Sequence, residues 1–190
     1  ILLVDASSSG QYGTRGKTKS ELIAEICALL AFSAVKNHDR VGLIIFSDQI
    51  EKYIPPKKGR LHVLRVVREL LSFTPKRRLT DLNVALKNLN DVITKRSTVF
   101  LFSDFLAEDY EKRLKVAFKK HDIVAIVVED PTEKDFPLLG GTVDLEDAET
   151  GETFALSAGR GFRERFRNVG LRRREARDRI FSSVGRSRPS

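Results

Sequence analysis

A chain of 190 residues with a formal net charge of +8 is long enough to bury one hydrophobic core and is expected to form one domain. Residues 159–190 hold 11 of the 34 basic residues and 3 of the 26 acidic ones, which leaves 23 of each in residues 1–158. The neutral body argues against a nucleic-acid footprint over the whole domain, and the single cysteine excludes an internal disulfide.

The chain opens with an apolar run, Ile1 to Val4, that is typical of a buried strand and ends on Asp5. The chain begins inside this strand and contains no Met, so we expect it to be part of a longer protein. A helix over 20–36 follows the loop and is apolar on nearly every side, as in a helix packed against a sheet. Its longest apolar stretch, around Ile26 to Val35, is too short to span a bilayer.

Residues 41–46 form a second buried strand, and residues 49–54 alternate between polar and apolar before Pro55-Pro56. That alternation, ended by prolines, predicts an antiparallel edge strand. Apolar residues at helical spacing predict helices over 61–71 and again after Thr80, where the repeat runs from Leu82 to Ile93.

A strand over 98–102 ends at Ser103-Asp104, and a helix with Glu108 and Asp109 in its first turn leads to a strand over 123–128. A hairpin is expected between 142–145 and 153–156, followed by an Arg-rich helix interrupted at Gly170. Alternating strands and helices predict an α/β fold: a Rossmann-like, doubly wound, mostly parallel sheet with one antiparallel edge strand. We expect a domain over 1–158 and an Arg-rich helix and tail over 159–190.

Oxygen-bearing side chains follow the strand ends: Asp5, Ser7 and Ser9 after the first, Asp104 after a later one, and Thr80 at the start of a helix. Ligands in open α/β sheets bind at the carboxyl ends of the strands. Hydroxyl and carboxylate oxygens suit Mg²⁺, or otherwise Mn²⁺ or Ca²⁺. The alternative is a purely structural role, in which these residues form turns and cap helices and bind no metal.

Two enzymatic interpretations compete for the same loop. Gly10 to Thr18 resembles a phosphate-binding loop ending in Gly-Lys-Thr, but five residues rather than four separate its first and last glycines. Phosphoryl transfer through an Asp5 nucleophile would pair that residue with a second acid two positions on, where this chain has Ser7.

Asp5-x-Ser7-x-Ser9, Thr80 and Asp104 together match the metal-ion-dependent adhesion site, and here the chain resembles the von Willebrand factor A domain. Short segments such as Phe46-Ser47-Asp48 and Tyr53-Ile54-Pro55-Pro56 are more specific. They resemble bacterial A-domain proteins of unknown function that are encoded beside MoxR-type AAA ATPases. Ala6, Ser8 and Gly10 depart from the common pattern at positions that supply no ligand side chain.

The resemblance implies a protein-binding module with no chemistry of its own, in which Ser7, Ser9 and Thr80 bind the ion directly and Asp5 and Asp104 act mostly through water. A partner's Asp or Glu would complete the coordination. The expected partner is a protein, such as an AAA ATPase, and not a specific nucleic acid. Family members usually carry transmembrane helices ahead of this domain, so a cytoplasmic domain tethered to the inner membrane by other segments is expected. The competing class is a nucleotide-binding enzyme using the loop from Gly10 to Thr18.

Overall fold

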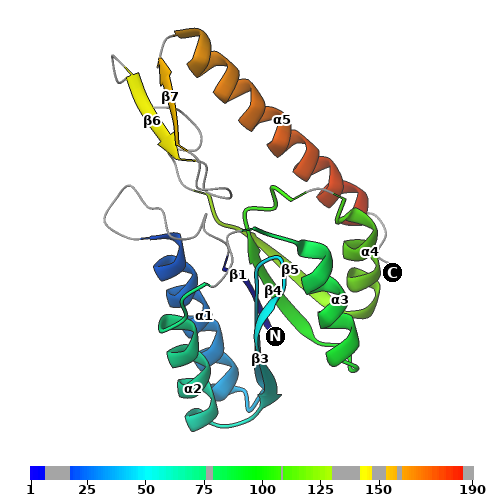
Figure 1. Ribbon diagram of the computed structural model, residues 1–190. Helices are drawn as coiled ribbons and strands as arrows, with labels where there is room; N and C mark the ends of the chain where they lie inside the picture. Colours follow the sequence, from blue (N-terminus) through cyan, green and yellow to red (C-terminus); the bar gives the residue numbers. More distant parts are fainter. Residues whose placement is uncertain are drawn as a thin grey trace.

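The computed structural model describes residues 1–6, 18–75, 79–107, 109–129, 142–146, 153–157 and 160–185. In this part of the chain an open sheet forms the centre of the molecule (Figure 1). Its five strands are β1 (Leu2–Asp5), β2 (Val41–Phe46), β3 (Ile50–Lys57), β4 (Thr98–Ser103) and β5 (Asp122–Val127), in the order β3-β2-β1-β4-β5. β3 is antiparallel to β2, and the other neighbours are parallel. The expected α/β fold with an antiparallel edge strand is confirmed.

Two layers of helices cover the sheet. α1 (Lys19–Lys36) and α2 (Arg60–Leu71) pack on one face, and α3 (Leu82–Val92) and α4 (Glu111–Lys120) pack on the other (Figure 1). Side chains of β1 alternate between the layers, because successive residues of a strand point to opposite faces. Leu3 therefore lies in the cluster with α3 and α4, whereas Leu2 and Val4 lie in the cluster with α1 and α2.

Polar residues fix where the helices on either side of the sheet begin. Thr18 and Glu21 form a reciprocal capping box before α1, so two backbone N–H groups of its first turn have side-chain acceptors. Asp81 caps α3 by accepting a hydrogen bond from the backbone N–H of Asn83 at 2.8 Å. Thr80, which we expected to open this helix, therefore precedes its capping residue.

The hairpin is present as β6 (Thr142–Glu146) antiparallel to β7 (Thr153–Ser157), outside the main sheet. α5 (Arg160–Gly185) then runs back to α4 (Figure 1). α5 continues through Gly170, so the expected interruption is wrong: a single glycine lowers helix stability by only about 1 kcal/mol. Ile180 and Phe181 join the core cluster beneath α5, and their packing holds its C-terminal half in place.

Two further expectations need correction. β3 continues past Pro55 and Pro56 to Lys57, because a register shift against β2 accommodates the prolines at this outer edge. α4 begins at Glu111 rather than near Asp109, which adopts a positive φ of 57°. Among the described helices, none combines the length and apolar character needed to cross a membrane.

Candidate functional site

The candidate site lies where the direction of chain winding reverses, between β1 and β4. β1 connects through α1 to β2 on one side, and its other neighbour β4 is reached only after α3. In such sheets the strand ends diverge at this point and leave a crevice for ligands. Asp5 ends β1, Ser103 ends β4, and Asp104 follows Ser103.

Asp5 is the centre of the arrangement. Its carboxylate is buried, with 8% of the residue exposed, and accepts hydrogen bonds from two other segments. The Ser103 hydroxyl donates to Oδ2 at 2.8 Å, and the Thr80 hydroxyl donates to Oδ1 at 3.3 Å across 75 residues of chain. The side chains of Asp5 and Thr80, which the sequence predicted to lie close together, are therefore in contact. Ser103, which was not among the predicted site residues, joins them.

The Thr80 loop is held from two directions. The backbone N–H of Asp81 donates to the carbonyl of buried Ser47, just after β2, at 2.9 Å. The Asp81 side chain simultaneously caps α3. These contacts fix the backbone on the C-terminal side of Thr80 and so help to orient its hydroxyl toward Asp5.

Asp104 is placed on the same edge, but its side chain folds back on its own loop. Oδ1 accepts a hydrogen bond from the backbone N–H of Leu106 at 3.1 Å, and Phe105 between them has a positive φ of 58°. A bulky residue in the left-handed region is strained, and such strain is concentrated at functional sites. The Phe105 ring contacts Phe181 with ring centres 5.0 Å apart, so packing maintains this backbone.

Tyr110 is a buried neighbour of this loop. Burial raises the pKa of its hydroxyl to about 12, and the negative charge of Asp104 contributes in the same direction. Tyr110 therefore stays neutral at physiological pH. Its ring lies 6.2 Å from that of Phe105, so it also supports the strained turn.

The donor set fits a hard divalent cation in its chemistry, because hydroxyl and carboxylate oxygens meet at a buried strand end. No three Asp, Glu, His or Cys side chains gather as a metal-binding group in the described ranges, so hydroxyl ligands would be needed. Ser7 and Ser9 lie outside the described residues, as do Gly10 to Lys17 of the near-phosphate-binding loop. Ser103 was not predicted as a site residue. The sequence pair Ser103-Asp104 at a strand end could have indicated it, but only Asp104 was selected from that pair.

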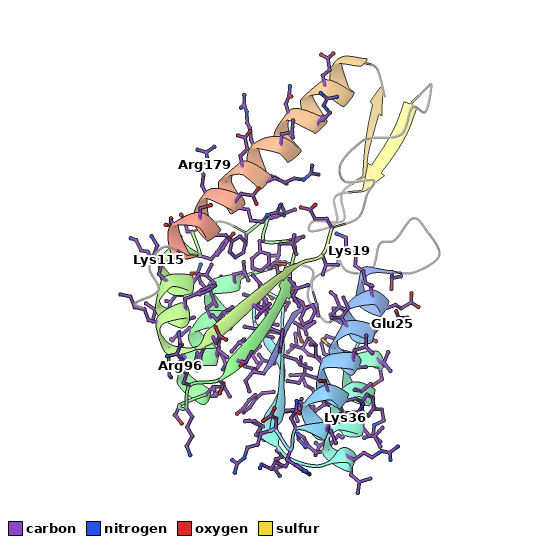
Figure 2. All side chains as sticks on the ribbon, turned by 180° about the vertical axis from the view of Figure 1, so that it is seen from behind. Lys19, Glu25, Lys36, Arg96, Lys115 and Arg179 are labelled. Atoms are coloured by element: carbon purple, nitrogen blue, oxygen red, sulfur yellow. The ribbon has the colours of Figure 1, made fainter. Side chains whose placement is uncertain are left out.

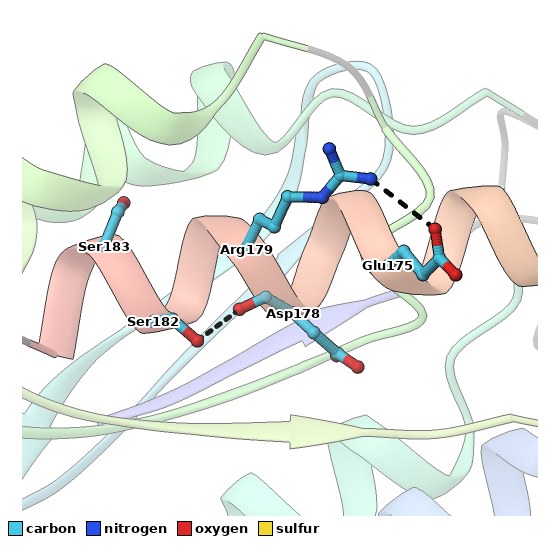
Figure 3. Close-up of a pocket in the computed structure, with 5 residues that line it drawn as sticks. All are labelled: Glu175, Asp178, Arg179, Ser182 and Ser183. Atoms are coloured by element: carbon cyan, nitrogen blue, oxygen red, sulfur yellow. Dashed lines mark hydrogen bonds and ion pairs between the residues drawn. The ribbon is translucent and has the colours of Figure 1, made fainter.

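Other polar clusters offer less. A shallow hollow on α5 is lined by Glu175, Asp178, Arg179, Ser182 and Ser183 (Figure 3). There Arg179 pairs with Glu175 at 3.5 Å, and Ser182 donates to the backbone carbonyl of Asp178. The Asp178 carboxylate pairs with Arg177, and the Ser183 hydroxyl donates to Glu111 of α4, so the polar side chains of this hollow are already engaged within the fold.

The fold and the site can now be compared with known proteins. A family model described as "Protein of unknown function DUF58" matches residues 1–176. The chain belongs to this family. Among curated relatives, the uncharacterized protein Rv1480 of Mycobacterium tuberculosis is 29% identical over 168 residues, covering 87% of this chain and 53% of that protein. The uncharacterized protein MAV169 of Mycobacterium avium is 28% identical over 136 residues, covering 70% of this chain and 79% of that protein.

The chain thus spans about half the length of Rv1480. Two solved structures are similar along nearly their whole length. The conserved hypothetical protein BatB from Bacteroides thetaiotaomicron has a TM-score of 0.63 and 16% identity, covering 98% of both chains. An aerotolerance-related membrane protein from Bacteroides fragilis has a TM-score of 0.62 and 15% identity, covering 97% of both. At these identities the likeness supports the α/β fold alone.

Proposed function

We propose that this chain is a divalent-metal-dependent protein-binding module whose metal site comprises Asp5, Ser7, Ser9, Thr80 and Asp104. The observation that carries the proposal is the hydrogen bond from the Thr80 hydroxyl to the Asp5 carboxylate. It joins two of the five proposed residues from distant parts of the chain, at the edge where α/β proteins bind ligands. The resemblance to the von Willebrand factor A domain supplies the remaining members.

The roles of the residues follow from their chemistry and burial. Ser7, Ser9 and Thr80 offer neutral hydroxyl oxygens as direct ligands, whereas Asp5 and Asp104 supply negative charge nearby. Ser103 orients the Asp5 carboxylate through its 2.8 Å hydrogen bond, as outer groups commonly do for metal ligands. A bound Mg²⁺ would provide a positive, incompletely neutralised position that attracts a carboxylate.

The partner we propose is a protein that presents an Asp or Glu side chain to this position. A carboxylate is favoured over a neutral group because the proposed direct ligands carry no charge of their own. We propose no catalytic activity, because the resemblance to the von Willebrand factor A domain implies a binding module. A MoxR-type AAA ATPase is the first partner to test, because of the resemblance to proteins encoded beside such ATPases.

We propose that the domain works on the cytoplasmic side of the inner membrane, tethered by segments outside these 190 residues. The Bacteroides fragilis neighbour is described as an aerotolerance-related membrane protein, which is compatible with such an arrangement. An AAA ATPase partner would require the same compartment.

Titration calorimetry with Mg²⁺ and Mn²⁺ tests the metal site. The wild type should bind and Asp5→Ala should not, whereas Asp39→Ala, at an exposed aspartate in the loop between α1 and β2, should bind like the wild type. Equal heats from the Asp5 and Asp39 variants would contradict the proposed site.

A pull-down with the AAA ATPase then tests the function. The complex should form with Mg²⁺ and be lost with chelator or with Thr80→Ala, but not with Thr94→Ala at an exposed threonine beyond α3. A complex that survives both treatments would show that the interface does not involve the metal.

A further inference from the structure

The end of the sheet opposite the candidate site is strongly basic. β2, β4 and β5 begin at this end, the last of them on Asp122, and the antiparallel β3 finishes there, so the turns before β2, after β3 and before β4 meet. Lys36 ends α1 and Arg40 precedes β2, Lys57 ends β3 and Lys58 follows it, and Lys95 and Arg96 lie in the turn before β4. Asp39 is the one acidic residue within these three turns.

The basic side chains lie close together in space. Arg40, Lys95 and Arg96 line one hollow of about 610 Å³, together with Asp39 and Pro56. Val41 and Lys57 are paired in the register of β2 and β3, so the turn after β3 lies beside the turn before β2. Figure 2 shows Lys36 and Arg96 at the end of the molecule away from Lys19, which begins α1 near the candidate site.

These cations are available for an external partner. All six residues are exposed, and the ion pairs found among the described residues include none of them. By contrast, the arginines of α5 nearest the body are engaged: Arg177 contacts Glu129, and the Arg174 Nε lies 3.6 Å from the same carboxylate. Unpaired cations gathered on one end attract a partner that carries many negative charges.

An aliphatic side chain beside the cations indicates the kind of partner. Leu61, in the first turn of α2 after Lys57, Lys58 and Arg60, has 84% of its surface exposed. Exposed leucine next to basic residues suits a bilayer surface, where the aliphatic group enters the acyl boundary and the cations meet phosphate. A surface that binds single-stranded nucleic acid instead offers aromatic side chains on which the bases stack.

We propose that this basic end, defined by Lys36, Arg40, Lys57, Lys58, Lys95 and Arg96 with Leu61, binds the surface of an anionic lipid bilayer. Strand β1 has 4 residues and so separates the two ends by about 13 Å at the rise of a strand. A domain seated on a membrane by this end presents the edge with Asp5 and Thr80 away from the lipid, toward soluble partners. The contact is independent of any anchor elsewhere in a longer protein.

Co-sedimentation of the 190-residue chain with vesicles tests the proposal. Vesicles of phosphatidylcholine with 30% phosphatidylglycerol, about the anionic content that gives a strong surface potential, are compared with pure phosphatidylcholine in chelator. The chain should bind the anionic vesicles and not the neutral ones, and binding should weaken steeply with added salt. Absence of binding to anionic vesicles would overturn the proposal.

Matched variants separate the basic end from the Arg-rich helix, which also attracts anions. Lys58→Ala/Lys95→Ala/Arg96→Ala removes three charges from the basic end, and Arg167→Ala/Arg172→Ala/Arg173→Ala removes three from exposed positions of α5. The first should lower the partition coefficient about a hundredfold, since each cation near an anionic surface contributes roughly a factor of five. The second should lower it much less, and an equal or larger loss would assign binding to α5 and overturn the proposal.

Leu61→Ser distinguishes a bilayer from a soluble polyanion. It should weaken vesicle binding several-fold without changing circular dichroism, because the side chain is exposed. A short DNA duplex, measured by fluorescence anisotropy at the same salt, should bind the basic-end variant as it binds the wild type. Vesicle binding insensitive to Leu61→Ser, or duplex binding lost with the basic-end charges, would identify a polyanion site and overturn the bilayer assignment.

Discussion

Replacing Ser103 by alanine should destabilise the fold by about 3 kcal/mol. Ser103 is 2% exposed; its hydroxyl donates to the Asp5 carboxylate at 2.8 Å and accepts from the backbone N–H of Phe105 at 3.1 Å. A hydrogen bond to a charged group is worth roughly 1.5–3 kcal/mol, and a buried N–H left without an acceptor costs about 1–3 kcal/mol. Together these contributions amount to about 2.5–6 kcal/mol, and our figure lies in the lower part of that range.

Urea unfolding followed by circular dichroism measures this loss, in chelator so that bound metal does not contribute. Ser182→Ala is the control, because Ser182 is exposed and its hydroxyl bonds only a backbone carbonyl of its own helix; its effect should stay within about 0.5 kcal/mol. A double-mutant cycle with Asp5→Ala should give a coupling energy of about 2 kcal/mol. A loss below 1 kcal/mol for Ser103→Ala, or no coupling, would refute the role assigned to this hydroxyl.

Four other predictions follow from single residues. Gly42→Ala should destabilise by about 1–3 kcal/mol in the same urea assay, because an added Cβ would lie 3.1 Å from backbone atoms of β3. Burial raises the pKa of the Cys27 thiol to about 12, so a thiol reagent should label Cys27 only after unfolding. Burial, with neighbouring positive charge, lowers the pKa of His121 below 6.5. Stability should therefore be full above about pH 6.5 and fall below it as the unfolded chain takes up the proton, and His121→Leu should reduce this fall in unfolding midpoints measured at pH 5 and 7. Lys17→Ala should leave ATP binding and hydrolysis unchanged, because we expect none; ATP hydrolysis abolished by this change would favour the nucleotide-binding enzyme.

The fold was predictable because its signals are local and repeated. Apolar runs that end on Asp5 and Asp104, alternating with helices of matching length, specify a doubly wound sheet through few possible connections. The antiparallel edge was also readable, from the alternation between Ile50 and Ile54. Its extension past Pro55 was not, because a register shift depends on how two distant strands meet.

The candidate site was predictable in part. The convergence of Asp5 and Thr80 follows once their strand and helix are placed, since topology brings those ends together. Ser103 was missed because a serine at a strand end has no distinctive pattern until its partner is known. His121 is only 1% exposed, and neither ring nitrogen has a hydrogen-bond partner among the described residues. Its burial depends on the packing of α4 over the sheet, which no local pattern encodes.

The position of β1 in the sheet has a consequence for how the chain folds. This central strand precedes both of its neighbours in the sequence, and it pairs with β2 at Leu2↔Leu43 and with β4 at Leu2↔Phe100. During synthesis, β1 can pair along both of its edges only after β4 has left the ribosome. Until then one edge of this apolar strand stays unpaired. Pairings of such long sequence separation slow folding and prolong the exposure of aggregation-prone strands. We therefore expect truncations that end before β4 to be insoluble, and chaperone demand to be greatest while the residues between β1 and β4 are being made.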